Sequence, residues 1–321
     1  MQKGLLAGAS PFTQLIMLVF TMVACFLLFL FAGILLAPLI FGIPISDLMT
    51  MVNDNQAESH LNLMRYLQTI QGISLFIIPA FFASYLFSGT AAGFLELERS
   101  APAKWFGVVF LVMLMAVPCI NLLAALNEMI VFPKSLSGLE QWFKNFEDAA
   151  QKTTKLFLEV DHVGWMFFNI LMIAVLPALG EEMIFRGLIQ KIFVRWTGNV
   201  HVGILISGFL FSLMHMQFYG FFPRWLLGVM FGYLMVWSGT LWLPVFAHFV
   251  NNAMAVFVAC LIHKGIIPEE IEVFGSTWGD IPVTIVTTAI SVWLLWAIYR
   301  QYQNKNSINV DTNVNTYTTT R

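Results

Sequence analysis

The chain has 321 residues, of which 59% are hydrophobic and 11% are charged, and its formal net charge is -2 at pH 7. An ordinary soluble domain carries roughly 25% charged residues, so this composition indicates an integral membrane protein surrounded by lipids. The 16 lysines and arginines are scattered rather than gathered into a patch. This distribution argues against a nucleic-acid partner.

Long apolar runs recur along the chain. A membrane-spanning helix needs about 20 predominantly apolar residues, and about eight runs approach that length, with counts between about seven and nine fitting the same pattern. The runs are Thr13–Ile40, Leu67–Phe87, Trp105–Leu126, Val163–Gly180, Val202–Phe218, Trp225–Ser238, Leu241–Ile262 and Ile281–Tyr299. The sequence therefore predicts an all-α, polytopic membrane protein with about eight transmembrane helices.

Four segments are expected within this one membrane domain. Residues 1–162 hold the first spans, 163–262 a core of helices, 263–302 the last loop and span, and 303–321 a tail. The tail is rich in Asn and Thr, which predicts disorder. In the first segment, Leu139–Phe157 repeats apolar residues at a helical period, which indicates a helix on the membrane interface. A loop helix packed on the spans without a separate role fits that pattern equally well.

Basic residues suggest the orientation. With eight spans and a cytoplasmic amino terminus, the following basic residues fall inside: Lys3, Arg99, Lys104, Arg186, Lys191, Arg195, Arg300, Lys305 and Arg321. Most of the others belong to one longer loop, which weighs less in the positive-inside rule. Both termini are therefore predicted to be cytoplasmic.

Two further patterns predict packing rather than chemistry. Cys25, Cys119 and Cys260 lie in separate apolar runs without the spacing of a zinc or redox site, so we interpret them as small buried side chains. Gly228 and Gly232 form a GxxxG pattern, which lets a second helix approach closely.

Two adjacent carboxylates, Glu181 and Glu182, end the fourth apolar run. A charged side chain near the hydrocarbon centre costs about 2.5 to 3.5 kcal/mol on insertion scales, so this pair predicts a functional site. Residues four apart share a helix face, whereas neighbours diverge by about 100 degrees. Glu182 is therefore expected to pair with Arg186, which leaves Glu181 free for chemistry.

Two histidines also lie well inside apolar runs. His215 follows Phe211 by one helical turn, and His248 precedes Asn252 by one turn. An imidazole and a carboxamide on one face are able to stabilise a developing oxyanion. We therefore expect Glu181 with His215 to polarise a water molecule that attacks a carbonyl carbon.

These residues resemble a known family. The chain contains, in order, Glu181-Glu182-x-x-x-Arg186, Phe211-x-x-x-His215 and His248-x-x-x-Asn252. They are similar to the three motifs of the type II CAAX prenyl endopeptidases, part of the CAAX-protease and bacteriocin-processing family (CPBP, or Abi). The resemblance covers about Val163 to Ile262. It implies an intramembrane endopeptidase that is reached from the cytoplasmic side and cuts near the C-terminus of a prenylated or otherwise membrane-associated substrate.

The resemblance also implies roles for the site residues. Glu181 would activate water with help from His215, while His248 and Asn252 would stabilise the oxyanion. Zinc held by Glu181, His215 and His248 is an alternative, because two histidines and a glutamate leave an open fourth position. We favour the metal-independent interpretation, since Asn252 is a natural oxyanion donor and no H-E-x-x-H motif occurs.

Other functions fit part of this pattern. A non-catalytic protein of the same fold would serve in bacteriocin immunity or as a binding scaffold. A proton-coupled transporter would use Glu181, His215 and His248 as a relay, but the halves of the chain show no repeat. The peptide or protein substrate and the oligomeric state stay open at this point.

Overall fold

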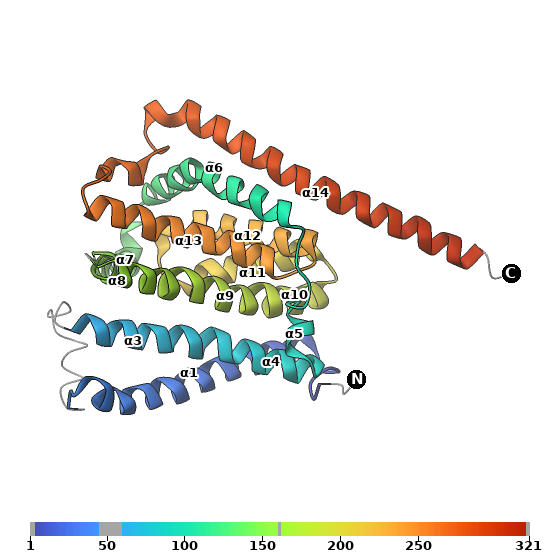
Figure 1. Cartoon of the computed structure of the whole chain (residues 1–321), viewed down its shortest axis with the longest axis horizontal. Helices are drawn as coiled ribbons and strands as arrows, with labels where there is room; N and C mark the ends of the chain where they lie inside the picture. Colours follow the sequence, from blue (N-terminus) through green and yellow to red (C-terminus); the bar gives the residue numbers. More distant parts are fainter. Residues whose placement is uncertain (1–3, 45–59, 160–161, 319–321) are drawn as a thin grey trace.

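The computed structural model describes residues 4–44, 60–159 and 162–318 (Figure 1). Within these ranges every regular element is a helix and no strand forms. This confirms the predicted all-α class.

Seven helices in these ranges are long and apolar enough to cross a membrane. Their bounds are Pro11–Phe41 (α1), Leu61–Ser88 (α3 and α4), Ala103–Glu128 (α6), Val163–Thr197 (α8, α9 and α10), Phe218–Ser238 (a turn and α12), Trp242–His263 (α13) and Trp278–Asn304 (a turn and the first part of α14). An eighth apolar helix, α11 (Val200–Met214), is shorter. A polytopic protein with roughly eight spans is therefore confirmed.

The fifth apolar run forms a shorter helix than the sequence predicts. α11 has 15 residues, which corresponds to about 22 Å of helix against a hydrocarbon core of about 30 Å. The chain leaves the helix after Met214 because Met216 takes a left-handed backbone conformation, with φ of 57°. A short 3-10 turn, Phe218–Gly220, then leads into α12 (Phe221–Ser238). α11 is therefore too short to cross the full thickness of the bundle.

The helices stack side by side in layers (Figure 1). α1 and the α3–α4 helix form one edge, α8–α10 lies next to them, α11, α12 and α13 fill the middle, and α6 and α14 form the other edge. Both ends of the chain lie at the same end of the bundle, which we call the terminus end, and the short α5 (Ala91–Phe94) lies there too. The cytoplasmic location of both termini stays a prediction.

The helix that carries the paired carboxylates extends beyond the predicted span. The sequence predicts an end at Gly180, but α8 (Val163–Asn169), α9 (Leu176–Glu182) and α10 (Gln190–Thr197) form one 35-residue helix with two π-helical stretches between them. The helix continues because the charged residues face the protein interior, where every residue from Met183 to Ile189 is buried. Glu181 and Glu182 therefore lie near the middle of a span, not near a membrane face.

The predicted interfacial helix is present as α7 (Ser137–Leu158). It contacts α3, α8, α13 and the 218–220 turn, and so lies across the end of the bundle opposite the termini, the α7 end (Figure 1). Its last turn is anchored: the Phe157 carbonyl accepts hydrogen bonds from Arg65 and Asn169. The guanidinium of Arg65 also lies 4.3 Å from the Trp165 ring centre. α7 is thus fixed at this end.

The C-terminal segment differs from its prediction. The composition predicts disorder over residues 303–321, but α14 (Ile281–Thr318) continues as helix into this range. A helix already formed by the packed span adds residues without a new nucleation cost, which explains the extension. The predicted division into four segments is otherwise untested and stays a prediction.

The glycine pattern packs as predicted, whereas only one of the three cysteines is buried as predicted. A Cβ atom on Gly228 would lie 3.0 Å from the Cα of Gly208, so α11 and α12 approach backbone to backbone at this point. All three cysteines are free thiols; Cys260 is buried, and Cys25 and Cys119 are half-buried.

Candidate active site

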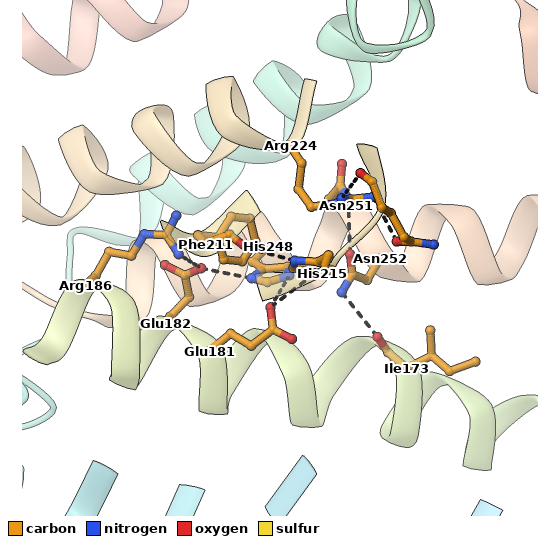
Figure 2. A network of polar contacts seen from close by, with 11 residues as sticks. Ile173, Glu181, Glu182, Arg186, Phe211, His215, Arg224, His248, Asn251 and Asn252 are labelled. Atoms are coloured by element: carbon orange, nitrogen blue, oxygen red, sulfur yellow. Dashed lines mark hydrogen bonds and ion pairs between the residues drawn. The ribbon is translucent and has the colours of Figure 1, made fainter. Parts of the chain in front are cut away.

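Residues of all three motifs line one cavity in the middle of the bundle (Figure 2). Glu181 comes from α9, His215 from the residue after α11, and His248 and Asn252 from α13 (Trp242–His263). The cavity has a volume of about 370 Å³. Helices far apart in sequence therefore bring together the four predicted catalytic residues.

Glu181 lies between the two histidines. Its Oε2 atom is 3.9 Å from Nε2 of His215 and 3.9 Å from Nε2 of His248. Oε2 is buried and has no hydrogen-bond partner within the protein. A water oxygen roughly 2.8 Å from both the carboxylate and an imidazole nitrogen fits such a separation.

Backbone geometry orients His215. Its Nδ1 is 2.8 Å from the carbonyl oxygen of Phe211, one turn earlier on α11. A carbonyl only accepts, so Nδ1 carries the hydrogen, and in the neutral ring Nε2 presents its lone pair toward Glu181. The Phe211 ring meets the His215 ring edge to face at 5.1 Å. Phe211 thus orients the imidazole and forms an apolar wall beside it.

Glu182 orients His248. The Nδ1 atom of His248 lies 2.9 Å from Oε1 of Glu182, and the ring stacks on Phe231 at 5.3 Å. Because the carboxylate accepts the Nδ1 hydrogen, Nε2 of His248 faces Glu181. The sequence predicts only an Arg186 partner for Glu182, since a contact with α13 depends on how the helices pack.

The predicted ion pair between Glu182 and Arg186 is present and fully buried. Nη1 of Arg186 lies 2.7 Å from Oε1 of Glu182, and neither side chain is exposed. Nη2 of Arg186 donates to the Gly228 carbonyl at 2.9 Å. The guanidinium also lies 4.6 Å from the Phe211 ring centre and 5.3 Å from that of Phe231. Arg186 therefore joins the first two motifs to α12, and the third motif is connected through Glu182, which contacts His248.

Asn252 is held by the carboxylate-bearing helix. Its Nδ2 donates to the Ile173 carbonyl at 3.2 Å, and its Oδ1 accepts from Nδ2 of Asn251 at 3.1 Å. Ile173 belongs to the π-helical stretch Ile170–Val175. A carboxamide has two N–H donors, so one of them is left for a ligand in the cavity.

Both π-helical stretches of this helix carry such contacts. In the second stretch, Met183–Ile189, the Phe185 carbonyl accepts a hydrogen bond of 2.8 Å from Ser207 on α11. Widened turns of this kind interrupt the regular hydrogen-bond ladder and occur often at functional sites. Here each stretch places one carbonyl where a neighbouring helix bonds it, on either side of Glu181.

Two polar residues of the cavity, Arg224 and Asn251, were not predicted from the sequence. Arg224 donates to the Oε1 and the backbone carbonyl of Gln217, at 3.0 and 3.3 Å. Among the described residues it forms no ion pair with a carboxylate. Its position one residue before the apolar run Trp225–Ser238 gives it no pattern that distinguishes it from an ordinary span boundary.

The carboxylate of Glu147, on α7, interacts electrostatically with the Arg224 guanidinium. Burial raises the pKa of Glu147, and the positive charge of Arg224 partly offsets this rise. The Arg224 guanidinium thus has one weak electrostatic partner on the α7 side and is otherwise directed at the cavity.

Glu181, His215 and His248 are residue types that bind zinc, but their donor atoms are spaced too widely for one zinc ion. Two ligands of one tetrahedral zinc ion, with bonds of about 2.0 Å, lie about 3.3 Å apart. Glu181 Oε2 is 3.9 Å from each imidazole nitrogen. Over the part of the chain that the structure describes, no three His, Cys, Asp or Glu side chains form a group suited to a metal ion. The residues as placed do not fit the zinc alternative.

Comparisons with known proteins agree with this geometry. Residues 163–254 match the family described as "Type II CAAX prenyl endopeptidase Rce1-like". Over 100 residues the chain is 32% identical to the sporulation-killing factor biosynthesis protein SkfC of Bacillus subtilis, and over 93 residues it is 29% identical to the uncharacterized protein YpbD of the same species. Residues 163–254 are thus similar to this CPBP-type family, which confirms the predicted resemblance.

The matched stretches are partial. They span 29% and 27% of this chain, and 20% and 43% of SkfC and YpbD respectively. No solved structure matches the chain.

Proposed function

We propose that the chain is an intramembrane endopeptidase that hydrolyses a peptide bond in a membrane-associated peptide or protein. The observation that carries this proposal is the arrangement around Glu181. Two imidazole Nε2 atoms from different helices lie 3.9 Å from the same carboxylate oxygen. The second nitrogen of each ring bonds an acceptor, Phe211 O or Glu182 Oε1, so both rings hold one orientation.

Glu181 and His215 act on the water. A water between Glu181 Oε2 and His215 Nε2 donates one hydrogen to each, so its lone pair faces a carbonyl carbon in the cavity. Attack forms the C–O bond as one proton passes to Glu181, and that proton then goes to the leaving amine as the C–N bond breaks. General acid–base help of this kind contributes roughly 10²- to 10⁴-fold to the rate.

The oxyanion forms on the other side of the carbonyl carbon. We assign its two donors to Nε2 of His248, whose Nδ1 is held by the Glu182 carboxylate, and to the remaining N–H of Asn252. Donors held before the reaction stabilise the developing charge without reorganising, and one such donor is worth about 10²- to 10³-fold in rate. Arg224, on the same cavity, is suited to bind a carbonyl or carboxylate of the substrate.

A peptide is the substrate class that the matching family description, a prenyl endopeptidase, supports. The proposal takes two further points from the family resemblance: the substrate is prenylated or otherwise membrane-associated, and the cleaved bond lies near its C-terminus. A metal-independent reaction is proposed because water fits between the site atoms and zinc does not.

The test compares membrane fractions of cells that express the wild type or Glu181→Gln. Glutamine keeps the shape of Glu181 but accepts no proton, so new peptide termini should form only with the wild type. Glu140→Gln on α7 is the matched control, since this glutamate pairs with Lys144 outside the cavity. A cleavage pattern that survives Glu181→Gln would reject the enzyme in favour of a binding or immunity role.

A further inference from the structure

A second cavity lies at the terminus end of the bundle, where α10 ends and the chain connects α5 to α6 (Figure 1). It has a volume of about 400 Å³, and we call it the basic pocket. Its charged lining residues are Arg99, Lys191, Arg195 and Glu96. Three cations against one carboxylate leave a net positive charge, which favours an anion in this pocket.

Two of the three cations are held in place by other side chains. Nζ of Lys191 lies 3.6 Å from Oε1 of Glu96, and Nη1 of Arg195 donates to Oε1 of Gln14 at 3.3 Å. Arg99 is exposed, and among the described residues it forms no ion pair with a carboxylate. The pocket thus combines fixed cations with one unpaired guanidinium, and such groups bind phosphate oxygens through charge-assisted hydrogen bonds.

The inner end of the basic pocket carries polar atoms without partners. Arg186 and Gln190 line this end, and both side chains are buried. Nε of Arg186 and Oε1 of Gln190 have no hydrogen-bond partner within the protein. Because one atom donates and the other accepts, a ligand hydroxyl is able to bond to either. Buried polar groups are normally satisfied, so these two atoms indicate a polar ligand group at the inner end.

An apolar groove adjoins the basic pocket. It lies between α12 and α14, beside the start of α11, and has a volume of about 570 Å³. Tyr233 and Trp237 on α12 and Trp296 on α14 line it, so we call it the aromatic groove. Val200 and Val236 line both the groove and the basic pocket. The two cavities therefore meet at these valines.

The aromatic groove changes from polar to apolar along its length. Because α14 runs toward the terminus end (Figure 1), Tyr302 and Gln303 lie nearer that end than Val292 and Leu295. The apolar part therefore lies deeper along the spans. Tryptophan and tyrosine are typical of the membrane–water interface, which agrees with a headgroup level near the end of α12. A phospholipid has the same order, from charged headgroup to acyl chain.

We propose that an anionic phospholipid binds here, with its phosphate in the basic pocket and one acyl chain in the aromatic groove. The phosphate oxygens accept hydrogen bonds from the three cations, and a headgroup hydroxyl, as in phosphatidylglycerol, bonds the polar atoms at the inner end. The groove favours a lipid over free phosphate, because free phosphate has no chain to fill it. This binding site does not rest on the proposed peptidase function, since neither cavity is lined by Glu181, His215 or His248.

Lipid binding to the purified protein in uncharged maltoside micelles tests the proposal. Native mass spectrometry measures the binding of dioleoyl-phosphatidylglycerol and of the zwitterionic dioleoyl-phosphatidylcholine. The thermal unfolding midpoint measures stabilisation by each lipid and by inorganic phosphate at equal ionic strength, since a ligand that binds the folded state raises this midpoint.

Two variants each remove one part of the site. Arg99→Gln removes the unpaired cation, and Val292→Trp fills the groove from a position that is 60% exposed. Lys104→Gln is the control for charge, because this exposed lysine begins α6 outside both cavities. Val286→Trp is the control for size, because Val286 is 58% exposed on α14 and does not line the groove. The midpoint without lipid checks that each variant folds.

We expect the wild type to bind phosphatidylglycerol about tenfold more tightly than phosphatidylcholine. Arg99→Gln and Val292→Trp should each weaken phosphatidylglycerol binding by about tenfold, whereas both controls should bind it like the wild type. Equal binding of the two lipids, or wild-type binding by Arg99→Gln or Val292→Trp, would overturn the proposal. Stabilisation by inorganic phosphate that phosphatidylglycerol does not exceed would also overturn it, because the occupant would then be a free anion.

Discussion

α1 and the α8–α10 helix are both long and apolar enough to span a membrane, yet their side chains meet different surroundings. On α1, large apolar side chains such as Phe20 and Leu28 are 64% exposed and face the surface that lipid covers. On α8–α10, Glu182 and Arg186 are fully buried. Apolarity therefore identifies both spans, whereas buried polar groups distinguish the helix that carries the site.

The buried ion pair should give the largest effect on stability. Arg186→Leu leaves the Glu182 carboxylate buried without its cation, which we expect to lower the free energy of unfolding by about 3–5 kcal/mol. Thermal unfolding in detergent measures this loss. The double variant Glu182→Leu/Arg186→Leu should recover much of the stability but not cleavage, because His248 then lacks its orienting carboxylate. A double variant as unstable as the single one would contradict this account.

Removal of the proposed oxyanion donor should act on the rate. Asn252→Ala is expected to lower kcat by about 10²- to 10³-fold. A peptide copied from a cleavage site found in the membrane fractions would serve as the substrate. Asn145→Ala, on the exposed face of α7, is the control for a carboxamide outside the cavity. A change in KM alone would instead place Asn252 in substrate binding.

Close helix packing in the core is tested at Gly228. Gly228→Ala places a Cβ about 3.0 Å from the Gly208 Cα, and overpacking of this kind costs roughly 1–3 kcal/mol. Gly107→Ala on α6 is the matched control, because nothing lies within 4 Å of its added Cβ. The unfolding midpoints of the two variants should therefore differ. Equal midpoints would show that the contact between α11 and α12 yields easily.

The smallest effect is expected on the lipid-facing helix. Phe20→Leu on α1 keeps an apolar side chain on an exposed surface, so its free energy of unfolding should change by less than about 0.5 kcal/mol. Both unfolding and peptide cleavage should match the wild type. A large loss of either would show that α1 contributes more than a lipid-facing surface.

Local sequence patterns predicted many structural features of this protein, because these features depend on residues that are close together in the sequence. The spans follow from runs of apolar residues, α7 from its helical period, and the Glu182–Arg186 pair from the four-residue spacing. The order of the three motifs also predicted the family resemblance that is found over residues 163–254. None of these inferences required knowledge of which helix lies beside which.

The remaining features depend on contacts between distant segments. The tertiary structure decided that Glu181 lies in mid-span, that Glu182 also orients His248, and that Arg224 faces the cavity. The physical reason is that burial, not composition, sets where a charged helix can continue and which side chains meet. The sequence by itself determined the helices and the chemical groups; helix packing determined their depth and their partners.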